Sequence, residues 1–154
     1  FVQPKIIDFG LSQVLTRPSR ALGGSLVWMA PEVFNGRALR CGSDMYSLGR
    51  LIAFVSTGQV PTLGVSSATW RHLLKSGRSP LPQWSSNNPF VARSKPLVEA
   101  CLQGERSRRP SAEKAYLVLL AQAEELGLPA PSAARDQALP WGPKAVEACL
   151  PPMQ

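Results

Sequence analysis

The chain has 154 residues, of which 44% are hydrophobic and 18% are charged, and its formal net charge is +7. This length fits one domain with a hydrophobic core, and the composition is that of a globular protein rather than a disordered or fibrous one. The positive charge does not predict nucleic-acid binding, because the arginines are scattered and no stacking aromatic side chains lie among them. Apolar runs such as residues 51–55 are far shorter than the roughly 20 residues that cross a bilayer, so no membrane partner is expected.

The cysteines and the N-terminus indicate the cellular compartment. Cys41, Cys101 and Cys149 are widely separated and odd in number, which disfavours both a disulfide framework and a zinc site. No basic start followed by an apolar run and a cleavage site is present, so we expect neither a signal peptide nor a transit peptide. Because the first residue is Phe1, we expect the chain to be truncated at its N-terminus. Together these features predict an intracellular, cytoplasmic protein.

The first predicted element is a short strand that ends in an acidic residue. Ile6 and Ile7 favour extended backbone, Asp8 follows them, and Gly10 can bend the chain sharply. A strand of this kind delivers one carboxylate, that of Asp8, to a site. Acidic residues are also common in turns after strands, and the local pattern alone leaves both interpretations open.

Two helices are predicted next. The first runs from Ser43, as N-cap, to Gly58, and it is apolar nearly all round, which predicts burial in the middle of a helical domain. The second spans about 68–75, with Trp70 directed inward. Residues 78–90 are rich in serine, proline and asparagine and predict a loop.

Two further helices complete the predicted fold. One begins after Ser94 and has Pro96 in its first turn, and the other begins at Ser111 and stops at Gly127. The last residues are rich in proline and alanine. We therefore expect a mainly α domain over residues 1–127 and a flexible tail over 128–154.

Four short motifs occur in a fixed order between about residues 4 and 126. They are Asp8-Phe9-Gly10, Ala30-Pro31-Glu32, the run Asp-Met-Tyr-Ser-Leu-Gly that starts at Asp44, and Arg109-Pro110. In this order, with helices between them, they resemble the C-terminal lobe of a protein kinase catalytic domain. The resemblance implies a helical subdomain with a short N-terminal strand and without the N-terminal lobe. The wording around Trp28 is most similar to the tyrosine-kinase-like group of serine/threonine kinases.

The resemblance implies a metal ligand and two cofactors. Asp8 would bind Mg²⁺ against the phosphates of ATP, since this is the role of the first residue of the Asp-Phe-Gly triplet. Phe9 would report the active or inactive state through its packing, and Gly10 would let the end of the strand move. The partner implied is a protein substrate, phosphorylated on a hydroxyl group.

The remaining implied roles concern docking and structure. Residues 11–30 resemble an activation segment, and Ser25 and Trp28 lie in what resembles its substrate-docking loop. Ser25 stands where threonine is usual. A hydroxyl group at this position is typical of kinases that act on serine or threonine. Asp44 would anchor the catalytic loop, although it is also a favourable first-turn acid. Glu32 and Arg109 would form a buried ion pair.

Several kinase motifs are missing from these 154 residues. The chain has no glycine-rich nucleotide loop, no strand lysine paired with a helix glutamate, and no His-Arg-Asp catalytic loop. The chain alone is therefore expected to be inactive. We favour the C-terminal part of a working serine/threonine kinase, because Asp8 is intact. The alternative is a noncatalytic kinase-like remnant that acts as a protein-interaction module. Oligomeric state and substrate identity stay open.

Overall fold

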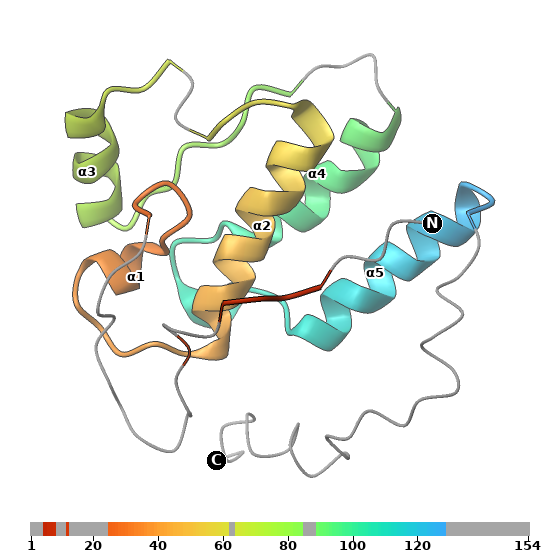
Figure 1. The fold of residues 1–154 in the computed structure, drawn as a ribbon, viewed down its shortest axis with the longest axis horizontal. Coiled ribbons are helices and arrows are strands. Elements are labelled where there is room, and N and C mark those ends of the chain that lie inside the picture. Colours follow the sequence, from red (N-terminus) through yellow and green to blue (C-terminus); the bar gives the residue numbers. More distant parts are fainter. Residues whose placement is uncertain (1–4, 9–11, 13–24, 62–63, 85–88, 129–154) are drawn as a thin grey trace, which may run out of the picture.

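The computed structural model describes residues 5–8, 12, 25–61, 64–84 and 89–128. Within them the mainly α fold predicted from the sequence is confirmed (Figure 1). The elements are α1 (Pro31–Phe34), α2 (Cys41–Thr57), α3 (Ser67–Lys75), α4 (Pro89–Cys101), the 3₁₀ helix η2 (Arg106–Arg108) and α5 (Ala112–Glu125). None of these helices is long and apolar enough to cross a membrane. The predicted tail lies, apart from Leu128, outside the described residues.

The short strand predicted at the N-terminus is not formed in the described part of the chain. Residues 5–8 have no regular secondary structure, and Ile6 and Ile7 are 86% and 79% exposed. A strand forms in a sheet with a neighbouring strand, and the described elements are all helices. An apolar pattern is therefore not sufficient to make residues 5–8 a strand.

Helix α2 lies at the centre of the fold and packs most extensively along α4 (Figure 1). Tyr46 and Ala53 contribute to one core cluster together with Val98 of α4. Met45 contributes to a second cluster with Cys101 and with Ala115 of α5. α2 thus connects both parts of the core.

A glycine sets how closely α2 approaches α4. A Cβ atom built on Gly49 would lie 2.5 Å from the Cβ of Cys101, which is closer than real Cβ contacts come. Cys101 itself is fully buried. Only a residue without a side chain fits at position 49 with the helices in these positions.

The ends of α2 differ in how well the sequence predicted them. The helix stops at Gly58, which adopts the left-handed conformation (φ 68°), as predicted. Its start was predicted wrongly, because α2 begins at Cys41 after an Arg40 N-cap without a side-chain cap. The Ser43 hydroxyl is directed elsewhere and donates to Glu32 Oε1 at 2.9 Å. Ser43 therefore joins two elements instead of capping one.

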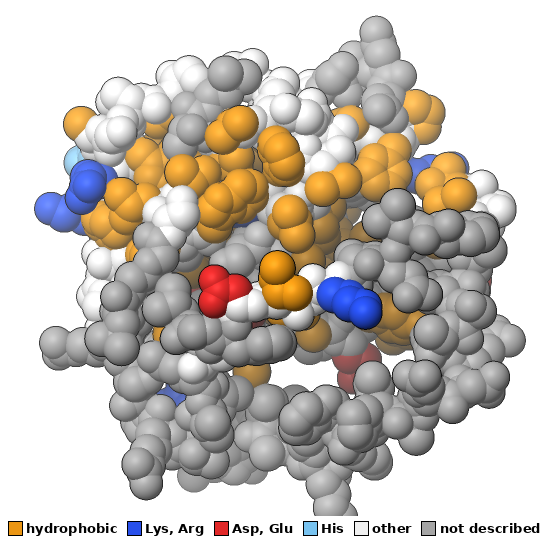
Figure 2. Space-filling model, in the orientation of Figure 1, with side chains coloured by type: hydrophobic (Ala, Val, Ile, Leu, Met, Phe, Trp, Pro, Cys, Tyr) orange, Lys and Arg blue, Asp and Glu red, His pale blue; other side chains and the backbone are white. Residues whose placement is uncertain are grey.

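Burial of α2 on all sides was also predicted wrongly for the described part of the chain. Leu51 is 49% exposed and Val55 is 67% exposed. Figure 2 shows hydrophobic side chains gathered in a band across one face of the molecule. The apolar surface of α2 is thus wider than the described helices cover.

The other helices follow the predicted order with one shift. α5 begins after Ser111, whose hydroxyl accepts from the Lys114 backbone N–H at 3.1 Å, as expected of an N-cap. α4 begins at Pro89, earlier than predicted, so Pro96 lies inside the helix. An internal proline removes one helical hydrogen bond. The helix continues because Val91 before Pro96 and Val98 after it are both buried.

Candidate functional site

The strongest polar contact in the described structure joins α1 to the turn before α5. Arg109 Nη1 and Nη2 donate to Glu32 Oε1 and Oε2, each at 2.7 Å, and both side chains are buried. The three other described ion pairs involve exposed side chains. The sequence positions 32 and 109 are therefore brought together by a two-point contact of the kind that fixes both partners in orientation.

Arg109 uses all of its donors. Besides the two bonds to Glu32, Nε donates to the Gln103 carbonyl (2.8 Å), Nη1 to the Gly42 carbonyl (2.8 Å) and Nη2 to the Gly104 carbonyl (3.2 Å). Its guanidinium also lies over the Tyr46 ring, 5.1 Å from the centroid. A buried charge is stable only when its donors are satisfied, and that condition is met here.

The Glu32 carboxylate is charged because its partners outweigh its burial. Burial acts to raise its pKa, but hydrogen bonds from Arg109, from the backbone and from Ser43, together with the positive charge of Arg109, lower the pKa below its ordinary value. The carboxylate is therefore ionised at neutral pH, and α1 is held in place by charge as well as by packing.

The loop before α1 is held at several points. The Trp28 N–H donates to the Ser25 carbonyl (3.1 Å), and the Ser47 hydroxyl of α2 donates to the Trp28 carbonyl (2.9 Å). The Trp70 indole N–H of α3 donates to the Leu26 carbonyl (3.1 Å). The Trp28 ring, half-buried, meets Phe54 edge to face with centroids 6.0 Å apart. Residues 25–30 are thus fixed against α2 and α3.

α1 is also tied to α3 on its far side. The Asn35 side-chain amide donates to the Leu74 carbonyl at 3.1 Å, near the end of α3. The Leu74 carbonyl also accepts from the Gly77 backbone N–H at 3.1 Å, so Asn35 adds a second hydrogen bond at this helix end. α1 and α3 lie side by side (Figure 1), so the loop, α1 and α3 form one connected surface. Ser25 is exposed.

Asp44 lies in the first turn of α2, and its carboxylate accepts no hydrogen bond from the described residues. Asp44 is exposed to solvent at its surface, but the protein packed around it desolvates the carboxylate enough to raise its pKa above the ordinary value. The helix N-terminus favours a negative charge here, while partial desolvation opposes it. A donor supplied from elsewhere would stabilise the charged form.

Asp8 is exposed and has an unusual backbone conformation. Its φ is 61°, in the left-handed region that few residues other than glycine adopt. Such conformations concentrate at functional sites. No three potential metal ligands cluster among the described residues. One exposed carboxylate still fits Mg²⁺, which is commonly held by one or two carboxylates plus substrate phosphates. Phe9 and Gly10 lie outside the described residues.

Sequence reasoning missed four residues that position this surface. Ser43, Ser47, Asn35 and Trp70 each donate a hydrogen bond to it. Trp70 is buried, as predicted, but an apolar helical pattern does not indicate that its indole N–H donates to the Leu26 carbonyl. The local pattern of Ser43 predicts an N-cap instead, and Ser47 has no distinguishing pattern, since a hydroxyl inside a helix can bond locally or point to solvent.

Comparison with known proteins identifies the class. Residues 2–117 match the protein kinase domain family. The match covers most of the chain, so the chain belongs to that family.

Individual relatives show the breadth of the family. The chain is 32% identical over 109 residues to the seven transmembrane domain-containing tyrosine-protein kinase 1 of Dictyostelium discoideum, covering 70% of the chain and 16% of that protein. It is 29% identical over 114 residues to a calcium/calmodulin-dependent serine/threonine-protein kinase of Malus domestica, covering 71% and 27%. It is 31% identical over 124 residues to mitogen-activated protein kinase kinase kinase 11 of Homo sapiens, covering 79% and 14%. The chain thus spans 27% or less of each of these relatives.

Proposed function

We propose that this chain is the C-terminal part of a serine/threonine protein kinase domain that transfers the γ-phosphoryl group of ATP to protein hydroxyls. The observation that carries the proposal is the segment of residues 25–32, made up of the loop before α1 and the first two residues of α1. It presents the exposed Ser25 at one end and is locked at the other end by the buried Glu32–Arg109 pair. A loop held in this way can orient a substrate segment without rearranging first.

In the proposed domain each site residue has one task. Asp8 binds Mg²⁺, which neutralises negative charge that develops on the transferred group. Phe9 and Gly10 allow the segment after Asp8 to change position. Asp44 accepts hydrogen bonds from the backbone of the catalytic loop, which would supply the donors that its carboxylate lacks among the described residues. ATP and Mg²⁺ are therefore the cofactors of the complete domain.

Specificity for serine and threonine is proposed from the docking loop. Ser25 presents an exposed hydroxyl where kinases of this specificity usually have threonine, and Trp28 is the fixed aromatic residue beside it. The names of the relatives include both a tyrosine kinase and serine/threonine kinases, so the family alone does not decide between the two.

The first test is to read the coding sequence directly upstream of Phe1. A His-Arg-Asp triplet and a following asparagine within a few tens of residues are expected. Their absence would exclude the enzyme, because no described or undescribed residue of this chain supplies the catalytic aspartate.

The second test uses the polypeptide that contains this chain, assayed with ATP, Mg²⁺ and pools of serine, threonine and tyrosine peptides. We expect transfer to serine or threonine that Asp8→Asn abolishes. Glu113→Gln, an exposed acid in α5, is the matched control and should leave the rate unchanged. Transfer that survives Asp8→Asn, or that is directed to tyrosine, contradicts the proposal.

A noncatalytic interaction module is the second candidate. The exposed Leu51 and Val55 on α2 favour it, because large apolar residues on a helix face mark contact surfaces. It predicts no catalytic triplet upstream and no phosphoryl transfer by the longer polypeptide. The same two tests therefore distinguish the candidates.

A further inference from the structure

Arg50 is a buried cation without a carboxylate partner in the described structure. It lies in α2, is 1% exposed, and takes part in none of the four described ion pairs. Nη1 donates to the Pro80 carbonyl at 2.7 Å, and Nη2 donates to the Tyr46 hydroxyl at 3.0 Å and to the Ser79 hydroxyl. These neutral acceptors do not balance the charge, and a buried charge is normally paired.

Comparison with Arg109 shows what Arg50 lacks. Both guanidinium groups lie over the Tyr46 ring, and that of Arg50 also lies over Trp70, 4.8 Å from its centroid. Arg109 makes five hydrogen bonds and has Glu32 as its counter-ion. Arg50 makes three, and its Nε has no partner at all. Arg109 thus has an anionic partner, and Arg50 has none among the described residues.

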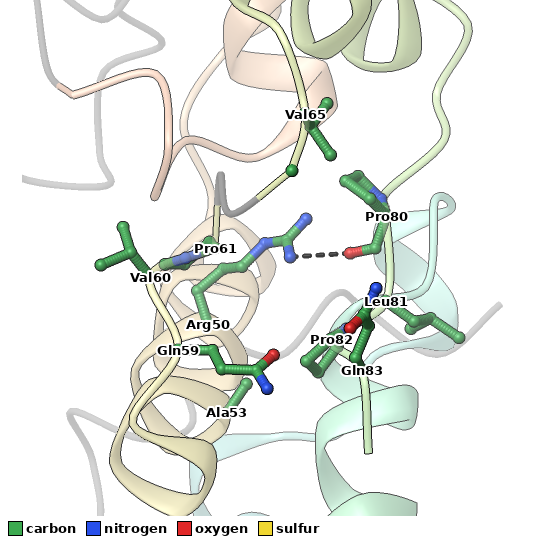
Figure 3. A pocket seen from close by; sticks show the side chains of 11 residues that line it. Arg50, Ala53, Gln59, Val60, Pro61, Val65, Pro80, Leu81, Pro82 and Gln83 are labelled. Carbon is green, nitrogen blue, oxygen red and sulfur yellow. Dashed lines mark hydrogen bonds between the residues drawn. The ribbon is translucent and has the colours of Figure 1, made fainter. Parts of the chain in front are cut away.

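Arg50 lies beside a cavity of about 150 Å³. Its side chain extends from α2 between two walls, one formed by residues 59–61 with Val65 and one by residues 80–83 (Figure 3). The walls are mainly apolar: Val60, Pro61, Val65, Pro80, Leu81 and Pro82. At the mouth, Val60 and Leu81 are about half exposed. Gln59 and Gln83 add two neutral amide side chains to the lining, and Arg50 is its one cation among the described residues.

We propose that this cavity binds the carboxylate of an aspartate or glutamate side chain from a protein segment. Its volume is well below the roughly 300–1,000 Å³ of sites for cofactors and other small molecules, but it is large enough for one side chain. A carboxylate would neutralise Arg50 one to one, whereas a phosphate dianion would bury a surplus negative charge. The exposed Val60 and Leu81 offer apolar contact to the neighbours of the acidic residue, which a free acid does not have.

The Nε atom of Arg50, which has no hydrogen-bond partner, can be reached only if the cavity wall moves. This atom is shielded from solvent, so an incoming carboxylate has to displace one wall slightly. Residues 80–83 have no regular secondary structure and are the wall that can move, whereas α2 is fixed by the core. Binding does not depend on phosphoryl transfer, so this proposal can fail while the kinase proposal stands.

The test follows the Nε–H signal of Arg50 by NMR in the full chain, with the signal assigned by its loss in Arg50→Lys. The probe is the blocked peptide acetyl-Leu-Glu-Leu-amide, and the matched control is acetyl-Leu-Gln-Leu-amide. We expect a saturable shift with the glutamate peptide and at least about tenfold weaker binding of the glutamine peptide, since a charge-assisted hydrogen bond is lost. Sodium acetate should bind more weakly than the glutamate peptide, and sodium phosphate should give no saturable shift.

Two variants separate binding from folding. Arg50→Met should abolish binding, and Val60→Trp should block the mouth from an exposed position while leaving the Arg50 signal in place. If Arg50→Met does not fold, Val60→Trp still decides the matter. The proposal is overturned by equal binding of the two peptides, by acetate or phosphate binding as well as the glutamate peptide, by no saturable shift, or by undiminished binding to Val60→Trp.

Discussion

At the scale of single residues, the pair formed by Glu32 and Arg109 differs in kind from the other ion pairs of the described structure. Exposed pairs such as Arg108 with Glu105 gain little, because water screens the charges and two mobile side chains must be ordered. Glu32 and Arg109 are buried, bidentate and surrounded by further donors and acceptors. Removing either partner would leave a charge without compensation in the interior.

We expect Arg109→Ala and Glu32→Ala each to lower the free energy of unfolding by about 3–5 kcal/mol, because each strands a buried charge. The double variant should be much less destabilised than the sum, because it strands none. Urea unfolding of the three variants measures these values. Arg108→Ala is the control, since its side chain is 71% exposed, and its effect should stay within about 0.5 kcal/mol. Equal small effects at positions 108 and 109 would contradict the role of the pair.

The same pair makes stability depend on acid. The pKa of Glu32 is lower in the folded chain than in the unfolded chain, so the unfolded chain takes up the proton first as the pH falls. The contribution of Glu32 is fully present above about pH 4.5 and is lost as the pH falls through the folded-state pKa. Glu32→Gln should remove this part of the pH dependence. The free energy of unfolding is measured in urea at several pH values between about 5 and 2.5. If it changes with pH equally in the Glu32→Gln variant and in the unchanged chain, the prediction is contradicted.

The residue scale also shows what a sequence can and cannot predict. Glu32 and Arg109 lie 77 positions apart, in two separate short motifs. Their contact was expected from the family resemblance, because no local sequence pattern could indicate it. Ser43 was predicted from local pattern to be an N-cap, but it donates to Glu32 instead. Arg50 gave no signal, because an arginine in an apolar helix is equally compatible with an exposed position. Long-range partners decide all three cases.

At the scale of elements, the approach of α2 to α4 depends on Gly49. Gly49→Ala should lower the free energy of unfolding by about 1–3 kcal/mol, because the new methyl group would overlap Cys101 and the helices would have to separate. Cys101→Gly removes the atom that it would meet. The double variant should therefore be less destabilised than the two single variants sum to. Thermal or urea unfolding of the three proteins provides the measurement, and strict additivity would show that the overlap is relieved in another way.

Helix ends were predicted best where the cap is chemical and local. Gly58 ends α2 and Ser111 caps the start of α5, as predicted. A left-handed turn and a side-chain cap depend only on neighbouring residues. The predicted start of α4 is too late, because a proline is expected in the first turn of a helix. Buried residues on both sides of Pro96 keep the helix continuous through it. The strand at residues 5–8 was predicted from apolar pattern alone, which does not supply a pairing partner.

At the scale of the whole molecule, the fold places the connected surface of residues 25–30, α1 and α3 on one side of α2 and leaves an apolar surface on α2 itself. The 154-residue chain incubated with ATP, Mg²⁺ and a generic basic protein should transfer no phosphate, since its sequence lacks the strand lysine and the catalytic aspartate. A radiolabel transfer assay checks this. Turnover that Asp8→Ala abolishes would contradict it, and turnover unaffected by Asp8→Ala would indicate a contaminating kinase.

Because Cys101 is buried, chemical labelling of its thiol can be used to follow unfolding. Burial raises the pKa of this thiol to about 11, despite the nearby charge of Arg109, and its position under Gly49 shields it from reagents. The thiolate is the nucleophile that reacts with thiol-specific reagents, so the Cys101 thiol is unreactive in the folded chain. With Cys41 and Cys149 replaced by serine, labelling of Cys101 would occur only when α2 and α4 part. At reagent concentrations where labelling outpaces reclosing, its rate in plain buffer would measure how long the native structure survives between openings.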